Sequence, residues 1–321
     1  MKKDAVMHII LCTDTHFIMP VGVLMCSVCV NNADADIVFH VVIDESVSET
    51  DKQDLSDVCS SFSGKTIEYH LINSNDFAHL PALGSTTMVT QATYYRLLLP
   101  ELLPDDLGKV LFLDGDMIVR GSLVELWNTA LEGYAFAAVP DPLDGTQEQY
   151  DRLGYPESCN YFNAGMMLVN LDYWRSHQST DRFFEVMRSK CDVIRYFDQD
   201  VLNFTFQGKV LPLHMKYNFM AVFLRKHSDR DERKKSAELQ EAIDNPVIIH
   251  YAGLKPWQYN RYNHPYSSSW KKYQSQTKWR AQPIKDTRSW YLRVVNFGAD
   301  LLRSVGLKKS KNPYMELLPV D

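Results

Sequence analysis

The chain has 321 residues, of which 45% are hydrophobic and 23% are charged, proportions typical of a soluble globular protein. The apolar segment at residues 17–30 is shorter than the ~20 residues of a membrane-spanning helix, so we expect neither a transmembrane helix nor an export signal. The formal net charge of −6 is uneven, with +7 in residues 266–321 and −13 in the remainder. A basic tail on an acidic body indicates an anionic partner, either a membrane or a nucleic acid.

The first hundred residues alternate between strands and helices. Apolar runs predict strands at residues 6–12, 37–43 and 66–72, and helices at residues 20–30, 49–62 and 88–99. Ser48 followed by Asp51 has the spacing of a capping box at the start of the second helix. Cys26 and Cys29 fit the first helix as small buried residues better than as a redox or zinc pair. Reduced thiols of this kind indicate a cytosolic location.

The pattern continues through residue 250. Strands are predicted at residues 110–113, 134–139, 161–171 and 247–250, and helices at residues 180–192 and 199–206. Ser122 and Glu125 are expected to cap a further short helix. This alternation predicts an α/β fold with a largely parallel sheet covered by helices on both faces.

Four polar residues follow or close predicted strands, namely Asp14, Asp116, Asp141 and His250. Ligands of such sheets bind beyond the carboxyl ends of the strands, so we expect these residues to share one site. Asp114 and Asp116 follow the buried run 110–113 two residues apart, so both side chains can leave the same side of the chain. Gly115 between them allows the backbone to turn and approach a ligand. Two carboxylates that point the same way repel each other unless a hard divalent cation lies between them.

His250 closes a strand and begins the segment His-Tyr-Ala-Gly-Leu-Lys-Pro-Trp. Its imidazole is a candidate third metal ligand, and two oxygens with one nitrogen favour Mn²⁺ over Mg²⁺ or Ca²⁺. Gly253 allows backbone amides to approach an oxyanion, and Lys255 supplies a point charge for phosphate. A metal ion and a lysine together are what a diphosphate leaving group requires.

Further polar residues supply the remainder of the expected site. Asp14 follows the first strand, where a nucleotide-binding α/β fold holds the ribose or the base. Arg96 is either a buried structural partner of a carboxylate or a clamp on a ligand carboxylate or diphosphate. Hydrogen-bonding side chains suited to sugar hydroxyls complete the group: Asp141, Asn163, Asp198, Gln199 and Asp200.

The order of four motifs carries a family resemblance. These are Asp114-Gly-Asp116, Tyr161-Phe-Asn-Ala-Gly165, Asp198-Gln-Asp200 and His250-x-x-Gly-x-Lys-Pro-Trp257. In this order the chain resembles glycosyltransferase family 8 over about residues 6–257, and is most similar to bacterial lipopolysaccharide α-glucosyl- and α-galactosyltransferases, with glycogenin a distant relative. Two positions depart from the family pattern: His16 stands where Asn is usual, and Lys255 follows His250 by five residues instead of six.

The resemblance implies a GT-A-type nucleotide-diphospho-sugar transferase fold, a UDP-sugar donor, Mn²⁺ (with Mg²⁺ as the alternative) and retention of anomeric configuration. It implies Asp114, Asp116 and His250 as metal ligands. It also implies a donor site that comprises Asp14, Arg96, Asp114, Gly115, Asp141, Asn163, Ala164, Gly253 and Lys255, with Asp14 on the uridine and Lys255 on the diphosphate. Gln199, nearest the reacting carbon, and Asp198 are the implied catalytic residues.

We therefore expect a catalytic domain at residues 1–265 and a basic aromatic tail at residues 266–321. Aromatic and cationic residues alternate in the tail, which suits either a membrane interface or a helix docked on the main domain. The resemblance favours the membrane, where a lipid-linked acceptor would be, and we expect no nucleic-acid partner. The expected location is cytoplasmic, peripheral on the inner face of the membrane.

The expected activity is transfer of glucose or galactose from UDP-glucose or UDP-galactose to a glycan or lipid-linked saccharide, in lipopolysaccharide or surface polysaccharide synthesis. One alternative is a nucleotidyltransferase acting on sugar phosphates. Residues 13–22 contain one glycine and no lysine or arginine, which disfavours the basic phosphate loop of such enzymes. The other alternative is a non-enzymatic module that binds a sugar nucleotide or a membrane.

Overall fold

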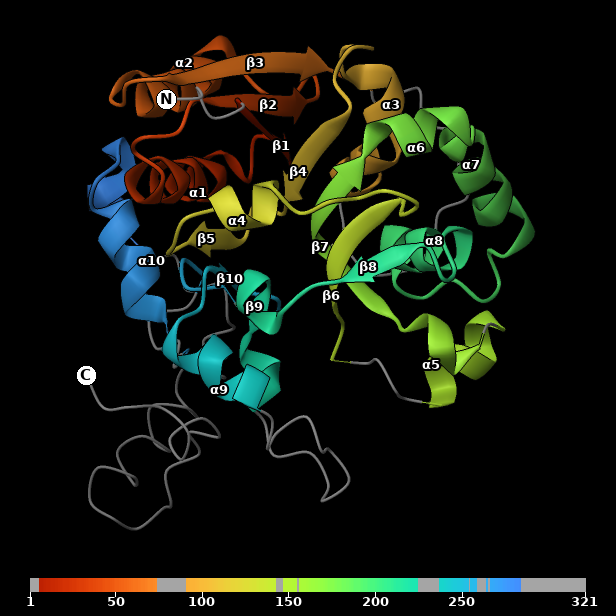
Figure 1. The fold of residues 1–321 in the computed structure, drawn as a ribbon. Coiled ribbons are helices and arrows are strands. Elements are labelled where there is room, and N and C mark those ends of the chain that lie inside the picture. The colour runs from red at the N-terminus through yellow and green to blue at the C-terminus, as the bar shows by residue number, and fades with distance from the viewer. Residues whose placement is uncertain are drawn as a thin grey trace, which may run out of the picture.

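The computed structural model describes residues 6–73, 91–142, 147–154, 156–224, 237–253, 255–258, 264 and 266–283. A seven-stranded sheet forms its centre, in the order β3-β2-β1-β4-β7-β6-β8 (Figure 1). The strands are β1 Met7–Thr13, β2 Ile37–Ile43, β3 Lys65–Leu71, β4 Lys109–Leu113, β6 Phe136–Pro140, β7 Phe162–Asn170 and β8 Val210–Pro212. All neighbouring strands are parallel except that β7 is antiparallel to β4 and β6. The predicted α/β fold with a mostly parallel sheet is confirmed.

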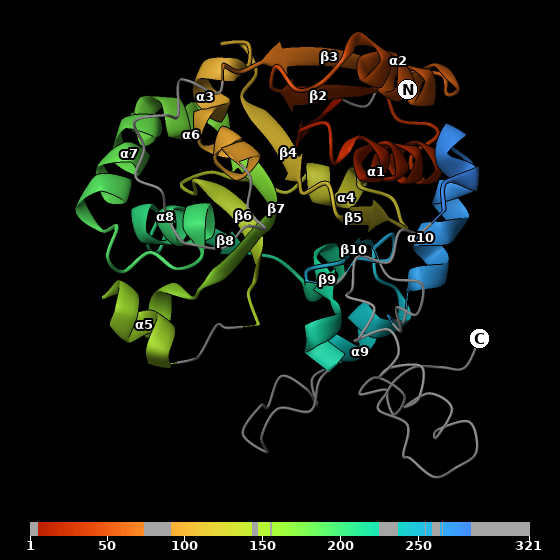
Figure 2. The same ribbon diagram turned by 180° about the vertical axis from the view of Figure 1, so that it is seen from behind.

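Both faces of the inner strands are buried, because alternate residues of β1, β4, β6 and β7 enter two separate cores, whereas the edge strand β3 is partly exposed. In β4, Leu111 and Leu113 pack on one face, and Val110 and Phe112 pack on the other. The helices are α1 Ile18–Asn31, α2 Glu49–Ser60, α3 Leu99–Leu102, α4 Val124–Trp127, α5 Gln147–Leu153, α6 Leu171–Ser176, α7 Ser179–Ser189, α8 Phe197–Thr205, α9 Ala237–Asp244 and α10 Ser267–Gln274. Helices α1, α2 and α10 cover the first face, and α3, α6, α7 and α8 cover the second (Figures 1 and 2).

A second sheet of three short strands explains how distant parts of the chain meet. Its strands are β5 Met117–Val119, β9 Phe219–Met220 and β10 Ile248–His250, with β10 in the centre. Because β5 and β10 are antiparallel, His250 pairs with Met117, and the backbone N–H of Tyr251 donates to the carbonyl of Asp116 at 2.9 Å. This pairing sets the end of the Asp-Gly-Asp motif beside the His250 segment.

The predicted helix starts have different outcomes. The capping box of Ser48 and Asp51 is present as predicted. The predicted capping pair of α4 is wrong, because the N-cap residue is Leu123, and Ser122 only accepts a hydrogen bond from the backbone N–H of Val124 at 3.3 Å. The helix predicted at residues 88–99 begins outside the described residues and is a 3-10 helix, Gln91–Leu98, before α3. Further 3-10 turns are Glu157–Cys159, Met215–Tyr217, Ala221–Leu224 and Lys278–Ala281.

The described start of the basic tail packs on the main domain. Helix α10 lies beside α1 in both ribbon views (Figures 1 and 2), with Trp270 only 1% exposed. Trp279 lies against Gly22 of α1 so closely that a Cβ at that glycine would be 2.1 Å from its ring. The predicted boundary at residue 265 stays a prediction, and the segment at residues 289–307 lies outside the described residues.

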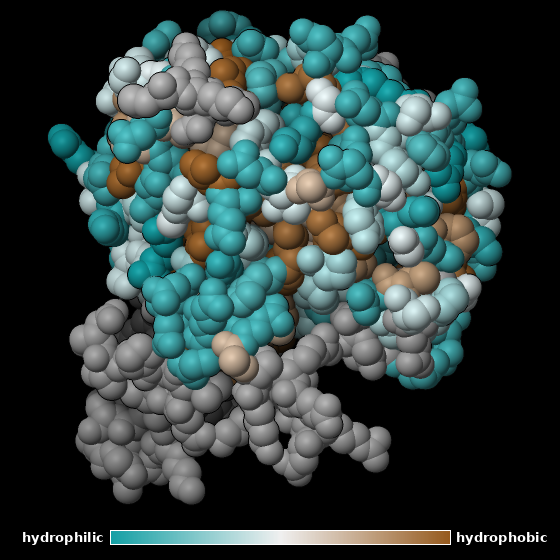
Figure 3. Space-filling model, in the orientation of Figure 1, coloured by the Kyte–Doolittle hydropathy of each residue, from teal (hydrophilic) through white to brown (hydrophobic). Residues whose placement is uncertain are grey.

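The surface facing the viewer in Figure 3 is mostly hydrophilic, with hydrophobic side chains in small separate groups. Among the described residues, no helix is both long and apolar enough to cross a membrane. Cys26 and Cys29 are buried on α1 as free thiols, in agreement with the prediction of small buried residues.

Candidate active site

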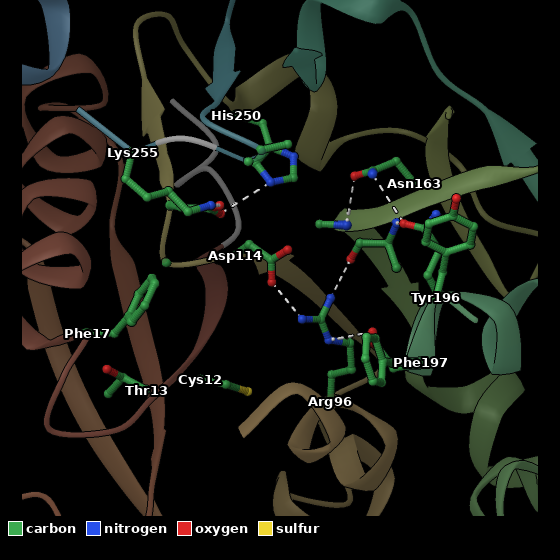
Figure 4. A pocket seen from close by; sticks show the side chains of 18 of the residues that line it. Cys12, Thr13, Phe17, Arg96, Asp114, Asn163, Tyr196, Phe197, His250 and Lys255 are labelled. Atoms are coloured by element: carbon green, nitrogen blue, oxygen red, sulfur yellow. Dashed lines mark hydrogen bonds and ion pairs between the residues drawn. The ribbon is translucent and has the colours of Figure 1, made fainter. Parts of the chain in front are cut away.

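A pocket of about 380 Å³ opens where β1 and β4 end and β7 begins (Figure 4). Because β7 is antiparallel to β4, its first residues lie at the same edge as the Asp-Gly-Asp motif, and the backbone N–H of Asp114 donates to the carbonyl of Gly165 at 2.8 Å. The lining residues are Cys12, Thr13, Asp14, Phe17, Arg96, Asp114, Gly115, Asp116, Asn163, Ala164, Gly165, Tyr196, Phe197, Asp198, Gln199, His250, Ala252, Gly253 and Lys255. All the predicted site residues line this pocket except Asp141, which contacts Asn163 and Gln199 from behind, and Asp200.

The three predicted metal ligands lie together. Oxygen or nitrogen atoms of Asp114, Asp116 and His250 all lie within 4.8 Å of one another. In the structure Nε2 of His250 is 3.2 Å from Oδ1 of Asp116, and Lys255 Nζ contacts Oδ2 of the same carboxylate. Two carboxylates and one imidazole at this separation fit the donor set of a divalent cation such as Mn²⁺.

Asp114 and Asp116 are in different electrostatic situations. Burial raises the pKa of the Asp114 carboxyl, and Arg96 opposes that effect only in part. Burial also acts on Asp116, but the cation of Lys255 and the ring of His250 outweigh it and hold the pKa of Asp116 well below its usual range. Asp116 is therefore the carboxylate with a fixed negative charge.

Gly165 allows this cluster to close. A Cβ at Gly165 would lie 2.6 Å from Cε1 of His250 and 2.8 Å from Oδ2 of Asp114. Any larger residue would push the two ligands apart. Gly115 lies in a turn at residues 115–116, as predicted, and lines the pocket without a positive φ; a Cβ there would lie 3.0 Å from Val21 of α1, so close packing also favours glycine.

Arg96 is buried between two carboxylates, as Figure 4 shows for Asp114. Its guanidinium donates to Oδ1 of Asp114 at 2.7 Å and to the carbonyl of Ala164 at 2.8 Å, and it pairs with Asp198 at 3.1 Å. The structure thus contains the buried carboxylate pairing, the first of the two interpretations of Arg96. Burial raises the pKa of Asp198 to about 7 in spite of Arg96.

Gln199 has a fixed orientation at the start of α8. Its Oε1 accepts hydrogen bonds from the backbone N–H of Ala164 and from Asn163, at 3.1 and 3.2 Å. Its Nε2 donates to Asp141 at 3.2 Å and lies 3.1 Å from the hydroxyl of Tyr161. Asp141 thus orients Gln199 and Asn163 from behind the pocket, and the donor role predicted for Asp141 stays a prediction.

Asp200 does not belong to the pocket. Its side chain is 0% exposed and is held by Arg152 at 2.7 and 3.0 Å, with two backbone N–H groups of residues 195 and 196 also donating to it. These contacts fix the turn that precedes α8. The third member of the Asp-Gln-Asp motif is therefore a structural residue.

Asp14 and Lys255 lie on the side of the pocket formed by β1 and β10. Oδ1 of Asp14 accepts from the backbone N–H of His16 at 2.8 Å, whereas the exposed His16 side chain is outside the pocket lining. Gly253 has a φ of +88°, which favours glycine, and the chain turns there before Lys255. The five-residue spacing from His250 still brings Lys255 into the pocket (Figure 4).

Sequence reasoning missed Asn218. It is fully buried, its Oδ1 lies 3.0 Å from Nδ1 of His250, and its Nδ2 donates to Asn163 at 2.8 Å. It therefore links the predicted metal ligand His250 to Asn163 and can set the tautomer of His250. No motif marks Asn218 in the sequence. Tyr196 and Phe197 were missed as well; the φ of +47° at Phe197 became visible only in the structure.

Comparison with known proteins agrees with this geometry. The model of glycosyl transferase family 8 matches residues 8–261. General stress protein A of Bacillus subtilis is 28% identical over 283 residues, 87% of this chain and 96% of that protein. The lipopolysaccharide 1,2-glucosyltransferase of Escherichia coli K12 is 28% identical over 246 residues, 76% of this chain and 70% of that enzyme. The lipopolysaccharide 1,3-galactosyltransferase of Salmonella typhimurium is 29% identical over 255 residues, 76% and 71% of the two chains.

Solved structures show the same fold. The galactosyltransferase LgtC, in complex with donor and acceptor sugar analogs, matches with a TM-score of 0.74 and 27% identity over 90% of this chain and 99% of that one. An active-site glutamine-to-glutamate mutant of LgtC matches equally well, with 28% identity over 89% and 99% of the two chains. The predicted GT-A-type fold is confirmed. Since the family model covers most of the chain, the resemblance seen in the motifs is also confirmed: the chain belongs to glycosyl transferase family 8.

Proposed function

We propose that this protein transfers glucose or galactose from a UDP-sugar to a saccharide acceptor, with retention of the anomeric configuration. The observation that carries the proposal is the meeting of Asp114, Asp116 and His250 beside Lys255, at the edge of a pocket whose opposite side bears Gln199 and Asn163. One side of this pocket suits a diphosphate and the other suits sugar hydroxyls. Family membership disfavours the nucleotidyltransferase and the non-enzymatic module.

The named relatives support this choice. They include a glucosyltransferase and a galactosyltransferase of lipopolysaccharide, and LgtC was solved with both a donor and an acceptor sugar analog. We infer that the acceptor is a glycan or a lipid-linked saccharide of the cell surface, and that the basic tail holds the protein at the anionic inner face of the cytoplasmic membrane.

Asp114, Asp116 and His250 would hold Mn²⁺, with Mg²⁺ as the alternative, and the bound ion would neutralise charge that develops on the departing diphosphate. Lys255 and the backbone at Gly253 take the phosphate oxygens, and Asp14 takes the uridine. Arg96, Asn163, Ala164, Asp141 and Asp198 bind or orient the sugar.

Gln199 supports retention. A carboxamide is a poor nucleophile and cannot act as a general base, so Gln199 does not fit ordinary double displacement. We propose same-face attack, in which the acceptor hydroxyl gives its proton to the leaving diphosphate. Gln199 then stabilises the oxocarbenium-like centre through its dipole, which its hydrogen bonds hold in place.

The test is a donor screen in which release of UDP is measured from a panel of UDP-sugars with Mn²⁺ and a mixture of saccharide acceptors. Turnover of UDP-glucose or UDP-galactose, giving an α-linked product by NMR, is expected. A β-linked product from an α-linked donor would overturn retention, and absence of turnover with every UDP-sugar would overturn the donor class.

A further inference from the structure

Three histidines lie in a diagonal row across the first three strands of the sheet, outside the pocket lining. They are His8 on β1, His40 on β2 and His70 on β3. In the strand register His40 is opposite Ile10, two residues beyond His8, and His70 is opposite Val42, two residues beyond His40. Because alternate residues share a face, all three rings point to the same side. Neighbouring ring centroids are 5.3 and 5.2 Å apart.

The nitrogen atoms of this row converge with one carboxylate. His40 Nδ1 lies 3.0 Å from His70 Nε2 and 3.4 Å from Oε2 of Glu68. Ligand atoms of these three residues all lie within 4.8 Å of one another. In a tetrahedral Zn²⁺ site, bonds of ~2.1 Å place neighbouring ligand atoms ~3.4 Å apart, close to the spacing found here.

The surroundings of this row suit a metal ion. One ring nitrogen of His40 faces His8, and the other faces His70 and Glu68, so the two sides of the ring have different partners. His40 is only 1% exposed, whereas the Glu68 side chain is 54% exposed, which gives an ion access from solvent. His8 Nδ1 lies 3.0 Å from the other nitrogen of His40 and can accept its proton, as the outer partner of a metal-bound imidazole does.

We propose that His40, Glu68 and His70 form a second metal site, selective for Zn²⁺, with His8 as the outer partner of His40. Imidazole ligands favour Zn²⁺ over Mg²⁺ or Ca²⁺. The ligands lie on β2 and on β3, the edge strand of the sheet, so the ion joins the edge strand to its neighbour. The site contributes to stability and does not depend on the proposed transferase function. A row of neutral histidines joined only by hydrogen bonds is the competing interpretation.

The experiment uses untagged, metal-free full-length protein carrying Asp116→Asn, which removes a ligand of the pocket cluster. Zinc bound after gel filtration is counted by mass spectrometry, and the melting temperature is measured with and without Zn²⁺. We expect one bound equivalent and a higher melting temperature with Zn²⁺ but not with Mg²⁺, since an ion that binds only the folded state stabilises it.

Adding His70→Gln should abolish this equivalent, and adding Glu68→Gln should weaken it by roughly tenfold or more. Glu68 is exposed, so its variant tests the site without disturbing the core, and Glu49→Gln on α2 is the matched control that should bind as the parent does. No bound zinc in the parent, or equal binding by the His70→Gln variant, would overturn the proposal. With residue 116 intact, Glu68→Gln should keep full Mn²⁺-dependent turnover, which separates this test from that of the proposed function.

Discussion

Asp116 has a fixed negative charge although it is buried, because Lys255 and His250 are both directed at its carboxylate. Asp114, only two residues earlier, has its pKa raised by burial. The two acids of one motif are therefore not equivalent. Since the Asp116 carboxylate is held in its charged form, Asp116→Asn removes a full negative charge from the proposed metal site.

Asp116→Asn should lower kcat/KM. We expect the loss to correspond to at least ~3 kcal/mol of transition-state stabilisation, the scale for loss of one key electrostatic group. EDTA should abolish wild-type turnover and Mn²⁺ should restore it. Asp34→Asn, an exposed acid outside the pocket lining, is the matched control and should leave turnover unchanged. Full turnover by metal-stripped protein would contradict the proposed metal site.

Gln199→Ala should lower kcat strongly and leave the affinity for UDP nearly unchanged, because the proposed uridine and phosphate contacts lie on other residues. Steady-state kinetics and calorimetry with UDP measure the two quantities. The exposed Gln53→Ala on α2 is the control for substitution of a glutamine. A parallel loss of UDP affinity would show that Gln199 organises the nucleotide site instead.

His264 should make stability depend on pH. Burial, followed by repulsion from His250, lowers its pKa to about 3, whereas an unfolded histidine titrates near 6.5. The stabilising contribution is complete above about pH 6.5 and is lost as the pH falls from there towards 3, because only the unfolded chain takes up the proton. Between pH 7.5 and 5.0 the wild type should lose about 2 kcal/mol more than His264→Phe in urea unfolding. An equal loss in both proteins would assign the effect to other groups.

Among the elements, α10 shows how the tail depends on the domain. Trp270 is buried, and the centroid of its ring lies 5.2 Å from that of Trp257. Trp257 in turn forms an edge-to-face contact with Phe17, which lines the pocket, at a centroid distance of 6.0 Å. The helix thus belongs to the core beneath the site, although the sequence grouped it with a basic appendage. A cut at residue 265 would remove part of this core.

Trp270→Ala should therefore reduce the free energy of unfolding by about 3–5 kcal/mol, the usual cost of truncating a buried tryptophan. Lys271→Ala, the next residue on the same helix and exposed, should change it by less than about 0.5 kcal/mol. Urea unfolding monitored by circular dichroism gives both values. A similar small change in both variants would mean that α10 does not stabilise the domain.

At the scale of the whole molecule, the uneven distribution of charge predicts that the basic C-terminal segment contacts an anionic membrane. Residues 284–321 hold seven basic and four acidic side chains, a net of +3. Each basic residue contributes roughly 1 kcal/mol at an anionic surface and each acidic residue offsets about as much, so removal of this segment should weaken binding to phosphatidylglycerol vesicles by about 3 kcal/mol at low salt. UDP affinity should not change, and neutral vesicles serve as the control. Equal sedimentation of both proteins with anionic vesicles would refute a role for this segment.

The sequence by itself determined the features that local physics controls. Runs apolar on both faces predicted the central strands, and the Ser48–Asp51 spacing predicted a real capping box. Four ordered motifs predicted the fold and, together with Asp14 and Arg96, most of the residues that line the pocket. The cap at Ser122 failed because spacing alone does not fix where a helix begins; the chain around α4 starts its helix after Leu123.

Only the tertiary structure decided which distant residues meet. Lys255 reaches Asp116 across 139 residues of sequence because β10 pairs with β5, and Asn218 joins His250 to Asn163 from a segment without a motif. The sequence also contained no sign that Asp200 is a buried partner of Arg152, or that three histidines form a row across the sheet. Residue spacing along one strand reports local burial, whereas contacts between strands depend on the order and register in which the whole sheet assembles.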